Sequence, residues 1–205
     1  MQYMAIKKNE SGGEAYSSFG IRKITTVSQP LFDVAKYAPN GPTTTLGGTE
    51  FACTEESYFT DNINEVATPQ KLWFCFSNDA TGSNEWQINS VSTTKWYWGK
   101  FYSPQPLIMQ SFGIDVNNNQ YHPAKIRLYG SNNDSQYTLI SNEQAIEQKA
   151  GLQAVTLQGT TAYQYFKLEM LPASTTALII YRIRYQAKMI QDYMAMIKLG
   201  GNDGS

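Results

Sequence analysis

The segment from Leu107 to Ile140 constrains the fold most, because hydrophobic and polar residues alternate along it. Between Ala124 and Gly130 the order is Lys125, Ile126, Arg127, Leu128 and Tyr129. A period of two residues is typical of a β-strand with one buried face. A second strand-like run, Leu107–Val116, precedes it, and an Asn-rich turn with a proline separates the two. The segment therefore predicts an all-β protein.

A tight polar turn, GSNNDS from Gly130 to Ser135, follows the second run, and a short strand is expected at Tyr137–Ile140. The whole stretch PAKIRLYGSNNDSQYTLI resembles the signature of discoidin-like domains, also called coagulation-factor C-type or galactose-binding-like domains. In that family a strand ends in Gly-Ser-Asn-Asp, and the next begins with an aromatic residue and a Leu. The resemblance implies a single jelly-roll β-sandwich that binds glycans, lipids or protein surfaces.

Other landmarks of the family occur in the same order and extend the resemblance over Thr49–Lys188. They are an Asp turn with a Thr and a packing Trp (Asp79, Thr81, Trp86), an aromatic strand (Lys95–Phe101), a late core strand (Tyr163–Met170) and a closing strand (Ala177–Gln186). In the family the aromatic strand precedes a Pro-containing turn, after which the long strand starts, here at Leu107.

The chain is expected to form one sandwich with two extensions. We predict an N-terminal arm over 1–48, the discoidin-like sandwich over 49–188 and a C-terminal tail over 189–205. Both ends carry apolar residues that lie outside the sandwich, and apolar surface that a domain cannot cover usually marks a contact site. We therefore expect the arms to join copies of this chain or to bind neighbouring proteins.

Charge and hydropathy exclude several classes of partner. Only 16% of the 205 residues are charged, against about 25% in an average soluble domain, and the net charge is −1. This balance gives no electrostatic basis for binding nucleic acid or an anionic membrane. The chain has no apolar run long enough for a transmembrane helix, and its N-terminus has no signal-peptide pattern.

The residues that catalysis requires are nearly absent. The single histidine, His122, is followed by Pro123 in a polar turn, and no GxSxG elbow supplies a nucleophile for it. The acidic residues are expected to be solvated loop charges rather than a glycosidase pair. Cys53 and Cys75 lack zinc-site spacing and are expected to be buried free thiols, with a disulfide as the alternative. We predict that the protein is not an enzyme.

The loop from Asn117 to His122 is the candidate binding site. Its members Asn117, Asn118, Asn119, Tyr121 and His122 offer amides and rings of the kind that bind sugar hydroxyls and sugar faces. In galactose-binding members of the family the corresponding loop supplies polar contacts, commonly with an Arg, which this loop lacks. An Asn-rich hairpin turn in left-handed geometry is the structural alternative. Trp86, Trp96 and Trp98 are expected to pack in the core.

No cofactor is expected, with a structural Ca²⁺ as the alternative. Many family members hold Ca²⁺ near the Asp turn, and the resemblance implies that Asp79 and Thr81 would take that part. The family's Glu in the closing strand has no counterpart in YRIRYQ from Tyr181 to Gln186. Ca²⁺ normally needs more negative charge than one Asp supplies.

Two functions follow from these observations. The first is a virion structural or appendage protein of a tailed bacteriophage, made in the host cytoplasm and exposed outside, with the sandwich contacting proteins or host glycans. The second is a secreted carbohydrate-binding module of a larger glycan-active system. Low charge, apolar ends and the missing signal pattern favour the first.

Overall fold

The computed structural model describes residues 3–6, 16–28, 43–46, 49–54, 75–76 and 85–198. In these ranges the regular structure is β-strand, apart from a single 3-10 turn at 75–76. The strands are β1 (Tyr3–Ile6), β2 (Tyr16–Ser28), β3 (Thr43–Leu46), β4 (Thr49–Thr54), β5 (Trp86–Asn89), β6 (Tyr97–Asp115), β7 (Pro123–Ser131), β8 (Thr138–Leu139), β9 (Gln144–Ala145), β10 (Leu152–Val155), β11 (Tyr163–Pro172), β12 (Ala177–Ile180) and β13 (Arg182–Lys198). The all-β prediction is confirmed.

The chain forms two compact units. The larger is Thr26–Met189, and the smaller combines Met1–Thr25 with Ile190–Ser205. In the smaller unit β1 pairs antiparallel with β2, with Tyr3 opposite Gly20, and β2 lies between β1 and β13 in the strand order. The predicted domain bounds 1–48, 49–188 and 189–205 stay a prediction.

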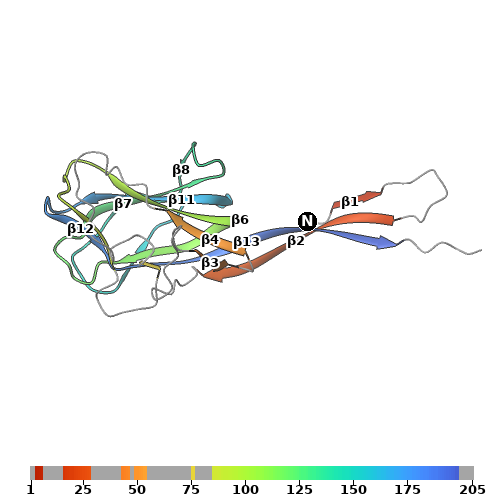
Figure 1. The fold of residues 1–205 in the computed structure, drawn as a ribbon, viewed down its shortest axis with the longest axis horizontal. Helices are drawn as coiled ribbons and strands as arrows, with labels where there is room; N and C mark the ends of the chain where they lie inside the picture. Colours follow the sequence, from red (N-terminus) through yellow and green to blue (C-terminus); the bar gives the residue numbers. More distant parts are fainter. Residues whose placement is uncertain are drawn as a thin grey trace, which may run out of the picture. The chain divides into compact units, whose positions relative to one another are not determined.

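The larger unit is built around β6, which belongs to two layers (Figure 1). Its first half, up to Tyr102, pairs with β4 on one side and with β11 on the other, and β11 in turn pairs with β7; this is the first layer. Its second half, from Leu107, pairs with β13 and β10; this is the second layer. All these pairs are antiparallel, and β5 and β12 form a separate two-stranded sheet.

A sharp bend in β6 brings its two halves face to face. Eleven residues of straight strand would separate Phe101 from Phe112 by about 36 Å. Their rings instead stack with centroids 6.5 Å apart. The bend lies between Tyr102 and Leu107, which pair with Tyr165 and Tyr163 of β11, so β6 carries three more residues than its partner there. Strands that change layers commonly do so at such irregularities.

The core between the layers is centred on the buried ring of Phe101. Phe166 of β11 stacks on it at 5.1 Å, Tyr185 of β13 at 5.6 Å, and Phe76 meets it edge-on at 5.4 Å. Such ring pairs contribute about 0.5–1.5 kcal/mol each beyond the area they bury. Because these rings come from both layers, the cluster joins one layer to the other.

A second irregularity sets which side chains of β6 face the core. Gln186 of β13 pairs with Ser111 and Ala187 pairs with Met109, so Gln110 is an extra, bulged residue. Before the bulge Leu107 and Met109 are buried, and after it the buried side chains are at even positions such as Phe112. The bulge therefore turns Ser111 and Gly113 to the outer face.

Two of the expected elements are wrong in detail. The Pro-containing turn between Phe101 and Leu107 does not form, because Pro104 and Pro106 lie in the bulged stretch of a continuous β6, where a missing N–H removes no ladder hydrogen bond. The closing strand Ala177–Gln186 is two strands, β12 and β13, in different sheets. The break is at Tyr181, whose N–H donates to Asp115 O at 2.9 Å.

Candidate functional site

The candidate loop, Asn117 to His122, connects β6 to β7 and is held by the loops beside it. Ile179 N donates to Tyr121 O at 2.8 Å, and Ala173 N donates to His122 O at 3.1 Å. The amide of Gln148, in the β9–β10 loop, donates to Asn118 O at 3.2 Å. Segments from four parts of the chain therefore meet at this end of the sandwich. We call them the end-loop cluster.

One buried carboxylate organises the cluster. Asp115, the last residue of β6, is 7% exposed. Its Oδ1 accepts hydrogen bonds from Asn117 N at 2.8 Å and Gly151 N at 3.2 Å, and its Oδ2 lies 3.7 Å from Arg182 Nη1. A carboxylate that accepts backbone N–H bonds and faces a guanidinium is well satisfied in a buried position. Asp115 thereby fixes the start of the candidate loop against β13 and β10.

Asn117 and Asn118 adopt the left-handed conformation, with φ of 48° and 58°. Asn tolerates this region better than most residues because its short polar side chain hydrogen-bonds locally. Both side chains are exposed. The left-handed turn geometry considered from the sequence is therefore present, and it presents two amides to solvent at fixed backbone positions.

The second half of the loop uses its side chains differently. Asn119 Nδ2 donates to Tyr181 OH at 3.0 Å, and its Oδ1 accepts from Tyr121 N at 2.8 Å, so this amide braces the loop. Tyr121 and His122 are half-buried. His122 Nδ1 lies 2.8 Å from Pro123 O; a carbonyl only accepts, so Nδ1 carries the proton. The ring is oriented by a carbonyl and not by a carboxylate, unlike the base of a catalytic triad.

The structure does not test the predicted Ca²⁺ ligands, because Asp79 and Thr81 lie outside the described residues. Within the ranges that the structure describes, no three acidic, His or Cys side chains gather as metal ligands would. The expectation of no cofactor, with Ca²⁺ as the alternative, stays a prediction.

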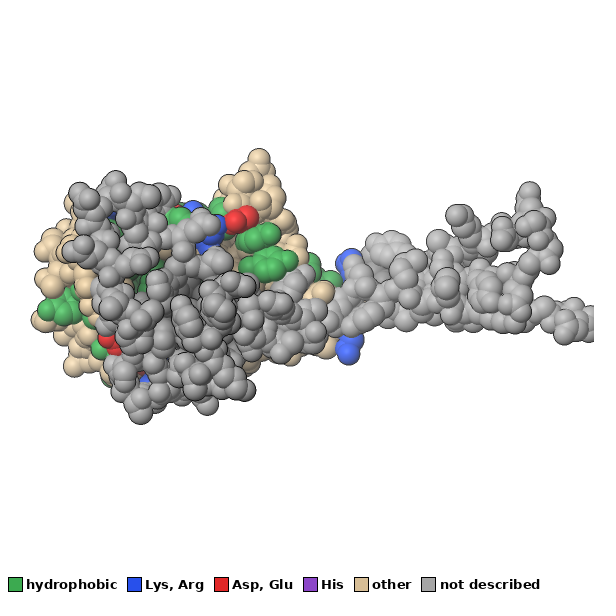
Figure 2. All heavy atoms as spheres, in the orientation of Figure 1, with side chains coloured by type: hydrophobic (Ala, Val, Ile, Leu, Met, Phe, Trp, Pro, Cys, Tyr) green, Lys and Arg blue, Asp and Glu red, His purple; other side chains and the backbone are tan. Residues whose placement is uncertain are grey.

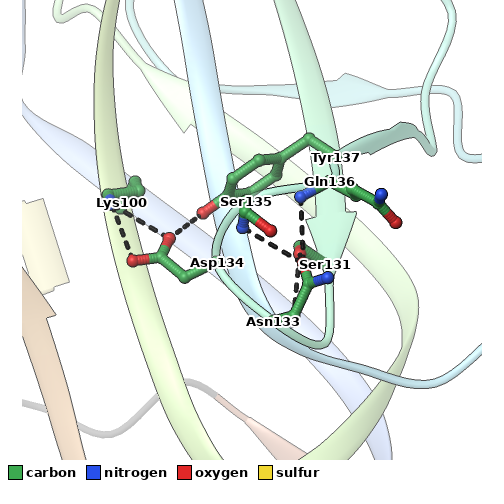
Figure 3. Close-up of polar contacts among 7 residues, drawn as sticks. All are labelled: Lys100, Ser131, Asn133, Asp134, Ser135, Gln136 and Tyr137. Atoms are coloured by element: carbon green, nitrogen blue, oxygen red, sulfur yellow. Dashed lines mark hydrogen bonds and ion pairs between the residues drawn. The ribbon is translucent and has the colours of Figure 1, made fainter.

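The signature turn GSNND builds a braced hairpin, shown in Figure 3. Asn133 Oδ1 accepts from Ser135 N at 3.1 Å and Gln136 N at 2.9 Å, and Ser131 Oγ donates to it at 3.0 Å. Asp134, at φ 54°, accepts from Lys100 Nζ at 2.9 Å and from the Tyr137 hydroxyl. These side chains are used to close the turn and tie it to β6.

Gly130 of the signature is explained by a close approach. A Cβ at this position would lie 2.3 Å from the ring of Tyr163, which packs over the glycine. No real Cβ contact is that short, so any larger residue would displace the tyrosine ring. The glycine is therefore needed for packing between β7 and the start of β11.

Beside the hairpin, the outer face of the first layer carries aromatic rings covered by cations. Arg127 lies 3.8 Å from the centroid of Trp96, and Lys167 lies 4.9 Å from that of Tyr129. Glu169 pairs with Arg127 at 2.7 Å and with Lys167 at 2.9 Å. Burial and the charge of Glu169 raise the pKa of the Tyr129 phenol. Hydrophobic, basic and acidic side chains adjoin one another on the described surface in Figure 2.

These positions settle what the tryptophans and one cysteine do. Trp86 is buried in the core, as predicted. The prediction that Trp96 and Trp98 pack in the core is wrong. Both are half-buried on the outer face, where Arg127 covers the ring of Trp96 and Lys100 lies 5.3 Å from the ring of Trp98. Cys75 is buried outside any disulfide, as predicted, and its thiol donates to Ile180 O at 3.2 Å. The side chain of Cys53 lies outside the described residues.

Sequence reasoning missed two members of the end-loop cluster. Neither Asp115 nor Gln148 was among the predicted site residues. The signal for Asp115 is a carboxylate at the end of an apolar strand, directly before an Asn-rich turn. Gln148 has no such signal, because its part depends on how the β9–β10 loop packs.

Neither a protein-family model nor a curated protein matches this chain. Among solved structures, the C-terminal domain of a chitobiase from Bacteroides fragilis is 11% identical with a TM-score of 0.54, over 71% of this chain and 99% of that domain. The family 32 carbohydrate-binding module of NanJ from C. perfringens, solved with galactose, is 12% identical with a TM-score of 0.50, over 66% and 93%. The fold is thus the predicted discoidin-like jelly-roll sandwich.

None of the described residues forms a helix of the length and hydropathy that crossing a membrane requires.

Asn118 tests whether the loop geometry depends on asparagine. Changing Asn118 to Ala should destabilise the protein by about 1–2 kcal/mol, because alanine resists the left-handed conformation. Changing it to Gly should cost much less, because glycine adopts this region freely. Urea denaturation of both variants measures the difference. Equal stability of the two would contradict the assigned backbone geometry.

Asp134 should make stability depend on pH. Burial raises its pKa, but hydrogen bonds from Tyr137 and Lys100, with the charge of Lys100, outweigh this and hold the pKa below its ordinary value of 3.8. The wild type should therefore be more stable than Asp134→Asn at pH 7. The difference should be only about 0.5–1 kcal/mol, because the Asp134 side chain is 38% exposed and solvent screens the ion pair. This advantage should shrink as the pH falls below 3.8.

Urea midpoints between pH 2.5 and 7 test this expectation. In Tyr137→Phe the total loss should be smaller and should be complete at a higher pH, because a hydrogen bond that lowers the folded-state pKa of Asp134 is gone. A difference between wild type and Asp134→Asn that stays constant over the whole range would show that the ion pair carries no stability.

Proposed function

We propose that this protein is a non-catalytic carbohydrate-binding protein whose sandwich binds glycans through the end-loop cluster. The observation that carries the proposal is the pair of exposed amides, Asn117 and Asn118, held on a loop that Asp115 fixes at its start. An amide offers two donors and one acceptor oxygen, which suits vicinal sugar hydroxyls. A braced loop loses little conformational freedom on binding, and this favours affinity.

The rings in the cluster complement the amides. Tyr121 and His122 are half-buried, so each combines a fixed orientation with an accessible part. Rings of this kind pack against the C–H face of a pyranose. Tyr121 O accepts a hydrogen bond from Ile179 N, which places the backbone of this residue beside β12.

The structural comparisons support a glycan as the ligand class. The NanJ module was solved in complex with galactose, and the second similar structure is a domain of a chitobiase. At 11% and 12% identity the comparisons concern the fold, so the choice of sugar rests on the loop of this chain. That loop has amides, a tyrosine and a histidine, and it has no arginine.

Loop variants test the proposal. After screening on a glycan array, calorimetry with the tightest neutral glycan should show saturable binding. Asn117→Gly and Asn118→Gly keep the left-handed backbone and remove the amide, and each should weaken binding by about threefold to tenfold. Tyr121→Ala and His122→Ala should weaken it at least as much.

The matched control is Thr93→Ala, which changes an exposed turn residue elsewhere. Its affinity should equal that of the wild type. Wild-type affinity in both Asn118→Gly and Tyr121→Ala would overturn the assignment of this loop.

A second proposal is that the smaller unit joins copies of this chain, as in a virion structural or appendage protein. It is favoured by the division of the chain, in which strands from both terminal regions form one compact unit. A three-stranded sheet needs a packed hydrophobic face for stability, and a neighbouring subunit can supply one. The finer form of this proposal is a tailed-phage decoration, fibre or tail component, assembled in the host cytoplasm and exposed outside. Secretion is the alternative location for a free carbohydrate-binding module.

Mass in solution tests the assembly proposal. Light scattering of the full chain over a concentration series should give a defined oligomer. A chain trimmed to residues 26–189 should be a folded monomer and should keep its glycan affinity. A monomeric full chain, or a trimmed chain with the same oligomeric state, would refute it.

A further inference from the structure

The β9–β10 loop, residues 146–151, lies beside the candidate loop and is fixed by hydrogen bonds of its own. At its start Ile146 N donates to Ala124 O at 3.0 Å. The side chain of Gln153 clamps the next residue, because its Oε1 accepts from Glu147 N at 3.0 Å and its Nε2 donates to Glu147 O at 2.8 Å. Gln153 is only 9% exposed, so the clamp is part of the folded interior. The start of the loop therefore has a defined backbone position.

The end of the β9–β10 loop is tied to the carboxylate that also holds the candidate loop. Gly151 N and Asn117 N donate to the same oxygen of Asp115, Oδ1, at 3.2 Å and 2.8 Å. Gly151 has a φ of 93°, a conformation that favours glycine. Because one oxygen binds both loops, Asp115 sets the spacing between them.

Gln148 reaches from the β9–β10 loop to the candidate loop. Its side chain is exposed, and its Nε2 donates to Asn118 O at 3.2 Å. A glutamine amide has two N–H donors and an acceptor oxygen. Within the described part of the chain, the acceptor Oε1 of Gln148 and its second N–H have no hydrogen-bond partner. The bond to Asn118 thus orients the amide and leaves two of its groups for a ligand.

The charged side chains around the two loops are paired. Lys149 Nζ lies 2.7 Å from Glu147 Oε2, and Arg182 Nη1 lies 3.7 Å from Asp115 Oδ2. Each of these four groups therefore has an opposite charge beside it. Amides remain as the groups that can bind a ligand, and amides suit uncharged hydroxyls.

With Gln148 included, the candidate contacts form a row across the end of the sandwich. Gln148 contributes from the β9–β10 loop, and Asn118 lies next to it. Tyr121 is further along the row, where its backbone O accepts from Ile179 N of β12. A row drawn from two loops suits a ligand with hydroxyls on more than one ring. Both loops are already fixed, so binding such a ligand orders little of the protein.

We propose that Gln148 is a direct contact for the glycan, and that the site takes a neutral oligosaccharide of at least two sugar units. One unit binds at Asn117 and Asn118, and the next binds the amide of Gln148. This inference rests on the proposed carbohydrate binding and adds to it the size of the ligand and the residue that selects it.

The test measures how the full chain binds disaccharides and their separate units. The probes are lactose, N-acetyllactosamine and chitobiose, with the methyl glycosides of galactose, glucose and N-acetylglucosamine. Any neutral oligosaccharide that binds more tightly on the array is added, together with the methyl glycosides of its own units. Calorimetry, or NMR titration where binding is weak, should show that the best oligosaccharide binds at least tenfold more tightly than any methyl glycoside.

Gln148→Ala separates a ligand contact from a bracing role. The variant should bind the best oligosaccharide about threefold to tenfold more weakly, because one hydrogen-bonding side chain is lost. It should bind the methyl glycosides within twofold of the wild type, because Asp115 still holds the candidate loop. Equal weakening for both kinds of probe would show that Gln148 only braces Asn118, and it would overturn the proposal.

Gln136→Ala is the matched control, because it removes an exposed glutamine side chain from the signature hairpin. Its affinity for every probe should lie within twofold of the wild type. A methyl glycoside that binds as tightly as the best oligosaccharide would also overturn the proposal, and so would wild-type oligosaccharide affinity in Gln148→Ala.

The outcomes distinguish this inference from the proposed function. Glycan binding that depends on Asn118, but not on Gln148 or on a second sugar unit, would refute the inference and leave the end-loop site in place. Absence of binding to every glycan would refute the proposed function, and this inference with it.

Discussion

The ring of Phe101 is the contact on which the sandwich depends. It comes from the first half of β6, and it packs on rings of β11, β13 and the second half of β6. Without this packing the bend in β6 would have no compensation for the ladder hydrogen bonds lost between Tyr102 and Leu107. The end-loop cluster lies at the end of the same strand, so the position of the candidate site is set by how β6 is held.

Polar residues that look alike in sequence have different uses in this fold. Asn133 accepts backbone bonds and closes the signature hairpin, and Asn119 braces the candidate loop. Asn117 and Asn118 instead have exposed side chains on a left-handed turn whose start is held by the hydrogen bond from Asn117 N to Asp115. The signature turn therefore accounts for the fold, and the exposed amides account for the proposed binding. The same distinction applies to the aromatic residues, since Trp96 is covered by Arg127 while Tyr121 lies in the loop cluster.

Alternation in the sequence was enough to predict β7 and the second half of β6, because one face of each is buried. It did not predict that β6 continues through Pro104 and Pro106, since nothing local shows that these residues lie in a bulge without ladder partners. The break between β12 and β13 at Tyr181 could not be predicted either, because the sequence on both sides of it looks like one continuous strand. The register that places Gly113 between Ala154 and Arg184 could not be predicted either, because pairing across strands so distant in sequence cannot be read from either strand alone.

The shared strand β6 also has a consequence for how the protein reaches its fold. Tyr97 of β6 pairs with Met170, and Asp115 pairs with Arg182. Neither layer can therefore form until the C-terminal part of the chain, far away in sequence, pairs with β6. Proteins dominated by such non-local pairs fold in milliseconds to seconds, slower than helical domains of similar stability. Since neither layer is complete without β6, a partly folded sandwich would expose the unpaired edges of β6 until β11 and β13 pair with it. During synthesis from the N-terminus, β6 therefore emerges before the strands that pair with it. In that interval its charged and bulged positions would limit pairing of its free edges with strands of other chains.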